Sequence, residues 1–389
     1  MASRRVTFVL GAGASCAYNK VPYPALSNLL QSIVQRADAR DEDAAPKQRL
    51  YLAYALSTAY GLDSPDLSCG RVPNSLIEQV LTSIKPIAYE NDSLLTAFRR
   101  LESRDDRSGT RAYWALAYSI AVYMTLMARR DLRLPTHSTS RRSAHRSLVE
   151  LFDELTETRV VDVVDMNYDG VLEHVRYERG SNVEFAWDCG RTRHVFNDSP
   201  EPLSRLADRR CFQPALDDGA YCRSVRLIKP HGDRCTFLRG SNEVYYSNGR
   251  HSHAHRATFP PVLRDIRTDD RFVRSSILPP THSRHRHGSQ FYEEEKERFV
   301  RAVCNGDDLV IVGWSASGSD TFYIDLFREE SRDHSNKPRL HIIDRSDGGA
   351  PNLELEERLQ KLCPGSTVAS RSMHGFTEAA VEALRRALL

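Results

Sequence analysis

The stretch Val6-Thr7-Phe8-Val9-Leu10-Gly11-Ala12-Gly13-Ala14-Ser15 stands close to the start of the chain. Its first five residues are β-branched or apolar and predict a buried strand, and the glycines after them predict an abrupt turn into a helix. Glycine accepts a positive φ in such a turn and lets a phosphate approach backbone N–H groups. The stretch indicates an α/β protein. Whether the turn binds a nucleotide or only joins two elements stays open, because a full dinucleotide fingerprint has a third glycine and a later acidic residue.

Composition narrows the class of protein. The chain has 389 residues, 40% hydrophobic and 27% charged, with a formal net charge of +2. This length predicts two or three structural units of a globular protein, and the near-neutral charge argues against a general polyanion-binding surface. The eight cysteines are scattered and form no Cys-x-x-Cys pair. A zinc ribbon or disulfide framework is therefore not expected, and a reducing, cytoplasmic compartment fits.

Two apolar segments raise the question of a membrane. The run after Arg4-Arg5 ends at Gly11, so we interpret it as a strand and not as an export signal. Residues 112–128 carry no charge but include Trp114, tyrosines and hydroxyl residues. They predict a buried core helix or an interface helix in preference to a membrane span. If the helix lies at an interface, it is a candidate assembly surface. No membrane association is expected.

Hydrophobic periodicity divides the chain into parts. Residues 35–156 predict a helical insertion, with a charged surface loop at 37–49 and helical spacing from about residue 50. Residues 176–275 alternate short β-like runs with turn residues and predict a smaller mixed insertion. The remaining parts, 1–34 and 157–389, predict one domain. Within them strands are expected near 6–10, 160–165, 225–229, 308–312, 340–344 and 367–371, with helices between most of them. This alternation predicts an α/β fold with a doubly wound parallel, Rossmann-like sheet.

Polar or glycine residues follow four of these strands. They are Gly11 to Ser15, Asn167 to Asp169, His231 with Gly232, and Gly313 with Ser315. Each has a local alternative: Asn167 and Asp169 suit helix capping, and His231 suits a structural histidine. Because the carboxyl ends of parallel strands face one crevice, we expect these groups to meet there.

Histidines cluster in two segments that lack accompanying carboxylates or cysteines in a set pattern. We interpret them as exposed loop residues, and no metal site is predicted. The six residues are His251, His253, His255, His282, His285 and His287.

Five motifs in this order resemble the sirtuin superfamily, specifically the sirtuin-like domains of bacterial anti-phage defence proteins. They are Gly11-Ala-Gly-Ala-Ser15 with the following Val21-Pro22, Asn167-Tyr168-Asp169 with Glu173, Lys229-Pro-His231-Gly232, Ile277-Leu-Pro-Pro-Thr281, and Gly313-Trp-Ser315 with Asp320. Three departures accompany the resemblance. The four-cysteine zinc module of deacylating sirtuins is not visible in this sequence, Met166 stands where threonine is usual, and Asp233 stands where a small residue is usual.

The resemblance implies roles for residues of this sequence. Gly11, Ala12, Gly13 and Ser15 would bind the pyrophosphate of NAD+. Asn167 would position the nicotinamide ribose and the attacking water, and His231 would be the general base. Asp169 would bind the carboxamide, while Gly313, Ser315 and Asp344 would contact the phosphate or adenosine end.

The implied function is that of an NAD+ glycohydrolase, with NAD+ as substrate and no zinc, which depletes cellular NAD+ during phage attack. A sirtuin-type protein deacylase or ADP-ribosyltransferase is one alternative. A non-catalytic NAD+ or ADP-ribose sensor, or an arginine-rich nucleic-acid-binding module, is another. Self-assembly into a homo-oligomer and pairing with a HerA-type hexameric ATPase are expected, with any nucleic-acid contact indirect.

Overall fold

The structure of this chain is a computed structural model. It describes residues 4–16, 26–38, 46–63, 72–90, 93–133, 139–169, 171–172, 175, 192–195, 206–210, 225–232, 236–239, 243–246, 273–279, 289–316, 320–331, 337–345 and 350–389. Several residues singled out above lie outside the described residues: Val21, Pro22, Glu173, Asp233, Pro280, Thr281 and the six clustered histidines.

The central element is a six-stranded sheet in the order β11-β10-β9-β1-β2-β5, in which every neighbouring pair is parallel. Strand β1 lies between β2 and β9, so the N-terminal strand occupies the middle of the sheet. This confirms the predicted α/β class and the doubly wound, Rossmann-like sheet. The strands are β1 (Arg5–Leu10), β2 (Val160–Asp165), β5 (Val225–Ile228), β9 (Asp308–Val312), β10 (Arg339–Ile343) and β11 (Thr367–Ser372).

Helices cover both faces of this sheet, as the alternation of side chains along buried strands requires. On one face Phe8 packs edge-on against Phe152 of α7, with ring centroids 4.7 Å apart, and α13 packs beside α7. On the other face Val9 and Ile311 share a buried cluster with residues of α10, α11 and α12. These helices are α7 (Thr139–Thr156), α10 (Gln290–Asn305), α11 (Thr321–Ser331), α12 (Leu353–Leu362) and α13 (Glu378–Leu388). Helix α12 is an addition to the predicted elements.

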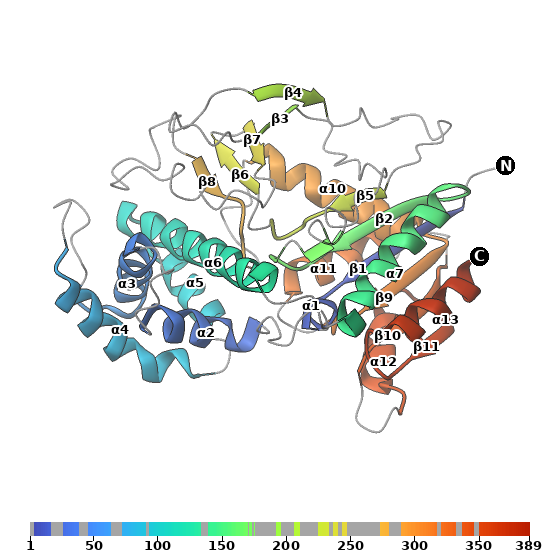
Figure 1. The fold of residues 1–389 in the computed structure, drawn as a ribbon, viewed down its shortest axis with the longest axis horizontal. Helices are drawn as coiled ribbons and strands as arrows, with labels where there is room; N and C mark the ends of the chain where they lie inside the picture. Colours follow the sequence, from blue (N-terminus) through green and yellow to red (C-terminus); the bar gives the residue numbers. More distant parts are fainter. Residues whose placement is uncertain are drawn as a thin grey trace.

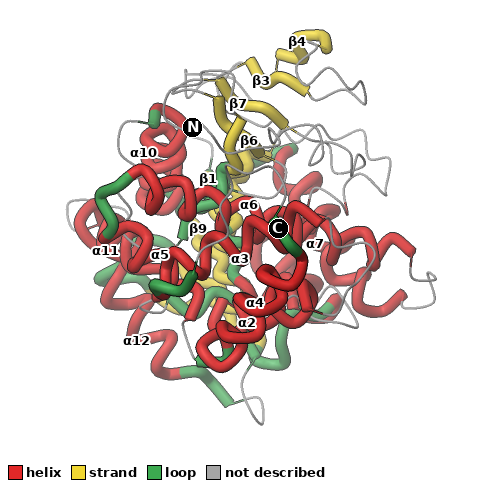
Figure 2. The backbone as a smooth tube through the Cα atoms, turned by 90° about the vertical axis from the view of Figure 1, so that its left-hand side faces the viewer, coloured by secondary structure: helices red, strands yellow, loops and turns green. Residues whose placement is uncertain are grey.

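A separate group of five helices stands beside the sheet, on the left in Figure 1 and toward the viewer in Figure 2. Its longest member, α6, contains the uncharged segment, and residues 112–124 are all buried within the chain. The core-helix interpretation is therefore confirmed, and this stretch does not form an exposed assembly surface. None of the helices in the described part of the chain combines the length and apolar character that a membrane span requires. The five are α2 (Leu26–Asp38), α3 (Pro46–Tyr60), α4 (Asn74–Ala88), α5 (Ser93–Ser103) and α6 (Arg107–Arg133).

A second, mixed sheet lies at the top of both views, in the order β4-β3-β7-β6-β8. It is built from strands of the region predicted as a mixed insertion, and β8 also contacts α6. Its strands are β3 (Thr192–Val195), β4 (Leu206–Arg210), β6 (Thr236–Arg239), β7 (Glu243–Tyr246) and β8 (Val273–Ser275). The exact boundaries of the two insertions stay predictions.

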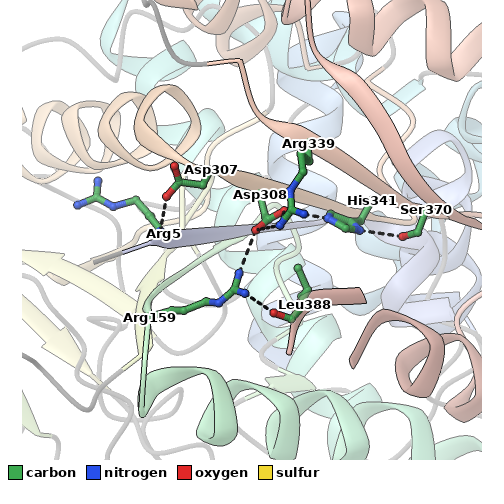
Figure 3. Close-up of polar contacts among 8 residues, drawn as sticks. All are labelled: Arg5, Arg159, Asp307, Asp308, Arg339, His341, Ser370 and Leu388. Atoms are coloured by element: carbon green, nitrogen blue, oxygen red, sulfur yellow. Dashed lines mark hydrogen bonds and ion pairs between the residues drawn. The ribbon is translucent and has the colours of Figure 1, made fainter. Parts of the chain in front are cut away.

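The amino ends of the main strands hold a buried polar network (Figure 3). Asp308, which is 0% exposed, accepts hydrogen bonds from Arg159 at 2.9 Å and Arg339 at 2.9 Å. His341 Nε2 lies 3.0 Å from Asp308 Oδ1, and His341 Nδ1 lies 2.8 Å from Ser370 Oγ. Burial alone would raise the pKa of Asp308, but the hydrogen bonds from His341 and Arg339 outweigh it and lower this pKa to about 2. The network joins three neighbouring strands.

Candidate functional site

The loops that follow β1 and β9 touch each other through glycine. The Gly11 N–H donates to the Val312 carbonyl at 2.9 Å, and the Gly13 N–H donates to the Gly313 carbonyl at 3.0 Å. Gly313 has φ +58°, and a Cβ there would lie 2.5 Å from the Ala14 nitrogen. The glycines therefore permit a backbone-to-backbone contact that side chains would prevent. Since two of the loop N–H groups already bond within the protein, the pyrophosphate role of this loop stays a prediction.

Asn167 lies where β2 ends and is tied to the glycine loop. Its side-chain amide donates to the Gly11 carbonyl at 2.9 Å, and its backbone N–H donates to Asp165 Oδ1 at 3.1 Å. Asp169 Oδ1 accepts a hydrogen bond from the Val171 N–H at 2.9 Å, as expected for a cap of the next helical turn. The structure thus holds the Asn167 side chain by a long-range bond and the Asp169 side chain by a local one, both at the carboxyl end of the sheet.

A buried ion pair connects the ends of β2 and β5. The Lys229 ammonium contacts the Asp165 carboxylate, and both side chains are at most 4% exposed. The backbone N–H of Lys229 donates to Glu295 Oε2 of α10 at 2.7 Å. Burial raises the pKa of Asp165, the contact with Lys229 opposes the rise, and nearby Asp169 adds to it. Removing either partner would leave a buried charge uncompensated.

The turn that carries His231 packs tightly against the segment after β8. The Leu278 N–H donates to the His231 carbonyl at 2.9 Å. Gly232 has φ +69°, and a Cβ there would lie 2.0 Å from the Ser276 carbonyl oxygen. The glycine after the histidine is thus required by both its backbone conformation and its close neighbour.

The His231 ring is 1% exposed and lies among aromatic rings and one carboxylate. Its centroid is 5.1 Å from that of Tyr323 and 6.2 Å from that of Tyr168, edge-on in both cases. Its Nε2 lies 3.4 Å from Asp320 Oδ1, an ion-pair distance, and the other oxygen of Asp320 accepts from Trp314 Nε1 at 2.7 Å. Asp320 thus places a carboxylate within ion-pair distance of the imidazole.

The five motif segments form a closed circuit of contacts. Asn167 joins Gly11, and Gly13 joins Gly313, as described above. Tyr168 Oη donates to the Leu278 carbonyl at 2.8 Å, which extends the circuit to the turn of His231. His231 closes it through Asp320, which follows Gly313 in the chain. The segments of Gly11, Asn167, His231 and Gly313 are therefore linked by direct contacts, and their role as one binding site stays a prediction.

A small, partly open hollow lies at one side of this circuit. It brings together Ser15, Asn167 and Asp169, three predicted site residues. Its remaining lining comes from Leu10, Ala14, His145, Leu148, Asp165, Val171, Leu172 and Phe376. The other predicted residues are not among this lining: Gly11, Ala12, Gly13, His231, Gly313, Ser315 and Asp344.

The predicted adenosine-side residues lie at the ends of β9 and β10. Ser315 is exposed just beyond β9. Asp344 Oδ2, just beyond β10, accepts from the Asn352 side chain at 3.0 Å, so this acid is already held by the start of α12. Both positions are at the carboxyl edge of the sheet, and their assignment to a nucleotide stays a prediction.

Sequence reasoning missed four residues of this region. In the sequence, Asp320 is only the last residue of the motif that begins at Gly313. Lys229 is only the first residue of a different motif, the one that contains His231. His145 and Phe376 had no signal at all, because each belongs to a segment that matches no motif and reads as ordinary helix or loop. Across the residues that the structure describes, no group of three or more potential ligands is placed to hold a metal ion.

No family model matches the chain, and no curated protein matches it. One solved structure, entitled "Structural Basis for the Mechanism and Regulation of Sir2 Enzymes", is similar over 99% of this chain and 92% of its own, at 11% identity and a TM-score of 0.40. A likeness at this level supports no conclusion about activity.

Proposed function

We propose that this chain is a sirtuin-like NAD+ glycohydrolase that converts NAD+ and water into nicotinamide and ADP-ribose. The observation that carries the proposal is the closed circuit of the five motif segments around the carboxyl end of the parallel sheet. This edge is where open α/β sheets bind nucleotides. Asn167 and His231, the two residues proposed for catalysis, both belong to the circuit.

The chemistry requires a site that tolerates positive charge on the ribose. The bond between ribose C1′ and the nicotinamide nitrogen breaks, its electron pair leaves on the nicotinamide, and the oxygen of water bonds to C1′. The logic is that of glycoside hydrolysis. In this proposal Asn167 positions the ribose and the water, and His231 takes the proton of the water and passes it to solvent. The carboxylate of Asp320, 3.4 Å from the imidazole, stabilises the protonated ring.

The biological setting is part of the proposal. We propose that NAD+ loss serves anti-phage defence, and that a homo-oligomer, together with a HerA-type ATPase, controls it. The motif resemblance supports this setting. A chain that destroys a central metabolite requires such control.

The experiment is to incubate the pure chain with NAD+ alone and to measure nicotinamide and ADP-ribose. We expect turnover without any peptide, and for Asn167→Ala a loss of roughly 10²-fold or more in kcat, since positioning of reactants contributes effects of that order. Asn305→Ala is the matched control, because Asn305 is exposed on α10, where its side chain donates to the Arg301 carbonyl of its own helix.

Other outcomes separate the alternatives. Turnover that depends strictly on an acylated peptide would indicate a deacylase. Binding of NAD+ or ADP-ribose with no turnover, in the chain alone and with a HerA-type ATPase added, would contradict the proposal and favour a sensor.

A further inference from the structure

Asp165, the last residue of β2, bonds two segments that carry the residues proposed for catalysis. Its Oδ1 accepts a hydrogen bond from the Asn167 backbone N–H at 3.1 Å, and its Oδ2 contacts the Lys229 ammonium. Lys229 stands two positions before His231, in the turn that follows β5. One buried carboxylate thus connects the segment of Asn167 with the segment of His231.

Further bonds hold the backbone at the Lys229 end of this connection. The Lys229 N–H donates to Glu295 Oε2 of α10 at 2.7 Å, and Glu295 is itself buried. The carbonyl of the next residue, Pro230, accepts from Tyr323 Oη of α11 at 2.7 Å. Two helices on one face of the sheet therefore fix the backbone just before His231.

A second ion pair joins the same two strands away from this end. Arg226 of β5 donates to Asp162 Oδ2 of β2 at 2.7 Å, and the two residues are partners in the strand register. Asp162 also lies 3.7 Å from Arg5, at the start of β1. Strands β2 and β5 are therefore held together by contacts other than the pair at their carboxyl ends.

The position of the pair of Asp165 and Lys229 matters more than its stability. A buried ion pair adds little net stability, because both charges lose their hydration on folding. Catalysis depends strongly on placement, since a shift of about 1 Å can cost roughly 100-fold in rate. Building on the proposed function, we infer that Asp165 and Lys229 are positioning residues, whose ion pair fixes Asn167 and His231 relative to each other for the attack of water on NAD+.

The test uses Asp165→Asn and Lys229→Met, as single variants and as a double variant. Each single variant should lower the melting temperature, because the other charge of the pair stays buried. The double variant carries neither charge, so its melting temperature should return most of the way to that of wild type. Its kcat for NAD+ cleavage should nevertheless stay roughly 10- to 100-fold below wild type, with a smaller change in KM, because the catalytic groups are misplaced.

The matched control is the double variant Asp162→Asn with Arg226→Met, which removes an ion pair between the same strands. It should leave kcat unchanged, whatever its melting temperature. Recovery of kcat together with melting temperature in the double variant of Asp165 and Lys229 would overturn the inference and leave this pair a structural one. An equal loss of kcat in the control would overturn it as well.

A second measurement does not depend on turnover and reads the connection across the ion pair. In NMR spectra of Lys229→Met, the signals of the Asn167 side-chain amide should shift relative to wild type. In those of Asp165→Asn, the signals of the His231 ring should shift. Unchanged signals at both residues would overturn the inference. Failure of the wild type to cleave NAD+ is a different result and contradicts the proposed function instead.

Discussion

Two buried histidines face aspartates at opposite ends of the same sheet. His341, toward the amino ends, has Asp308 at 3.0 Å from one ring nitrogen and Ser370 at 2.8 Å from the other (Figure 3). His231, at the carboxyl ends, lies 3.4 Å from Asp320 between the rings of Tyr168 and Tyr323. Each histidine is 1% exposed. Burial and an acidic neighbour are thus common to both and do not identify a site.

The difference lies in what surrounds each pair. Asp308 also bonds two arginines, and both nitrogens of His341 are bonded within the sheet, so the serine, histidine and aspartate form a structural chain. The His231 pair instead belongs to a circuit of turns beside a hollow. Placement at the carboxyl edge, where loops can be opened to a ligand, distinguishes the candidate site.

The largest expected effect comes from exchanging the two histidines for alanine. His231→Ala should lower kcat for NAD+ cleavage by roughly 10²- to 10⁴-fold, the usual contribution of a general base. His341→Ala should leave kcat of the folded protein unchanged and lower its stability. Steady-state kinetics and thermal melts of both variants make the test. Equal losses of kcat in the two variants, at temperatures where both are folded, would contradict the assignment of His231 to catalysis and of His341 to structure.

The next effect concerns the stability that Asp308 provides. Asp308→Asn should lower the free energy of unfolding at pH 7 by about 3 kcal/mol, because it removes the acceptor of a buried charged network. The pKa of Asp308 in the folded state, about 2, is below that of an aspartate in an unfolded chain. Its contribution is therefore fully present above about pH 4 and is lost as the pH falls through about 2.

Urea unfolding between pH 2 and pH 7 measures this contribution. Other carboxylates also titrate in this range, so the difference between wild type and Asp308→Asn is the relevant quantity. That difference should shrink by on the order of 2 kcal/mol toward pH 2. A difference that does not depend on pH would mean that Asp308 is not stabilised as an anion.

The smallest effect tests the serine of the amino-end network. Ser370→Ala should cost about 1 kcal/mol, the usual net value of one hydrogen bond, and leave NAD+ turnover unchanged. A chemical denaturation curve gives the first quantity, and an assay of the same sample gives the second. Loss of an enzymatic activity in this variant would show that the serine, histidine and aspartate act chemically and not only structurally.

Much of the sheet was predictable from short stretches. Val6 to Leu10 and Leu309 to Val312 are β-branched or apolar runs followed at once by glycine, and each belongs to a central parallel strand that ends just before that glycine. Helix α12 escaped prediction, although Leu355, Leu359 and Leu362 form a buried stripe. Its apolar residues are few among charged ones, so its pattern resembles that of a surface loop.

Part of the candidate site was likewise predictable from the sequence, and part was not. The sequence by itself determined that Gly11, Asn167, His231 and Gly313 follow strands, because strand and turn preferences depend on a few adjacent residues. Only the tertiary structure decided that Asp320 faces His231, that Lys229 pairs with Asp165, and that His145 and Phe376 reach the hollow. These contacts join residues that lie far apart in the sequence, from 64 positions for Asp165 and Lys229 to 231 for His145 and Phe376. They depend on strand order and on the direction in which each side chain leaves its element, which local preferences do not encode.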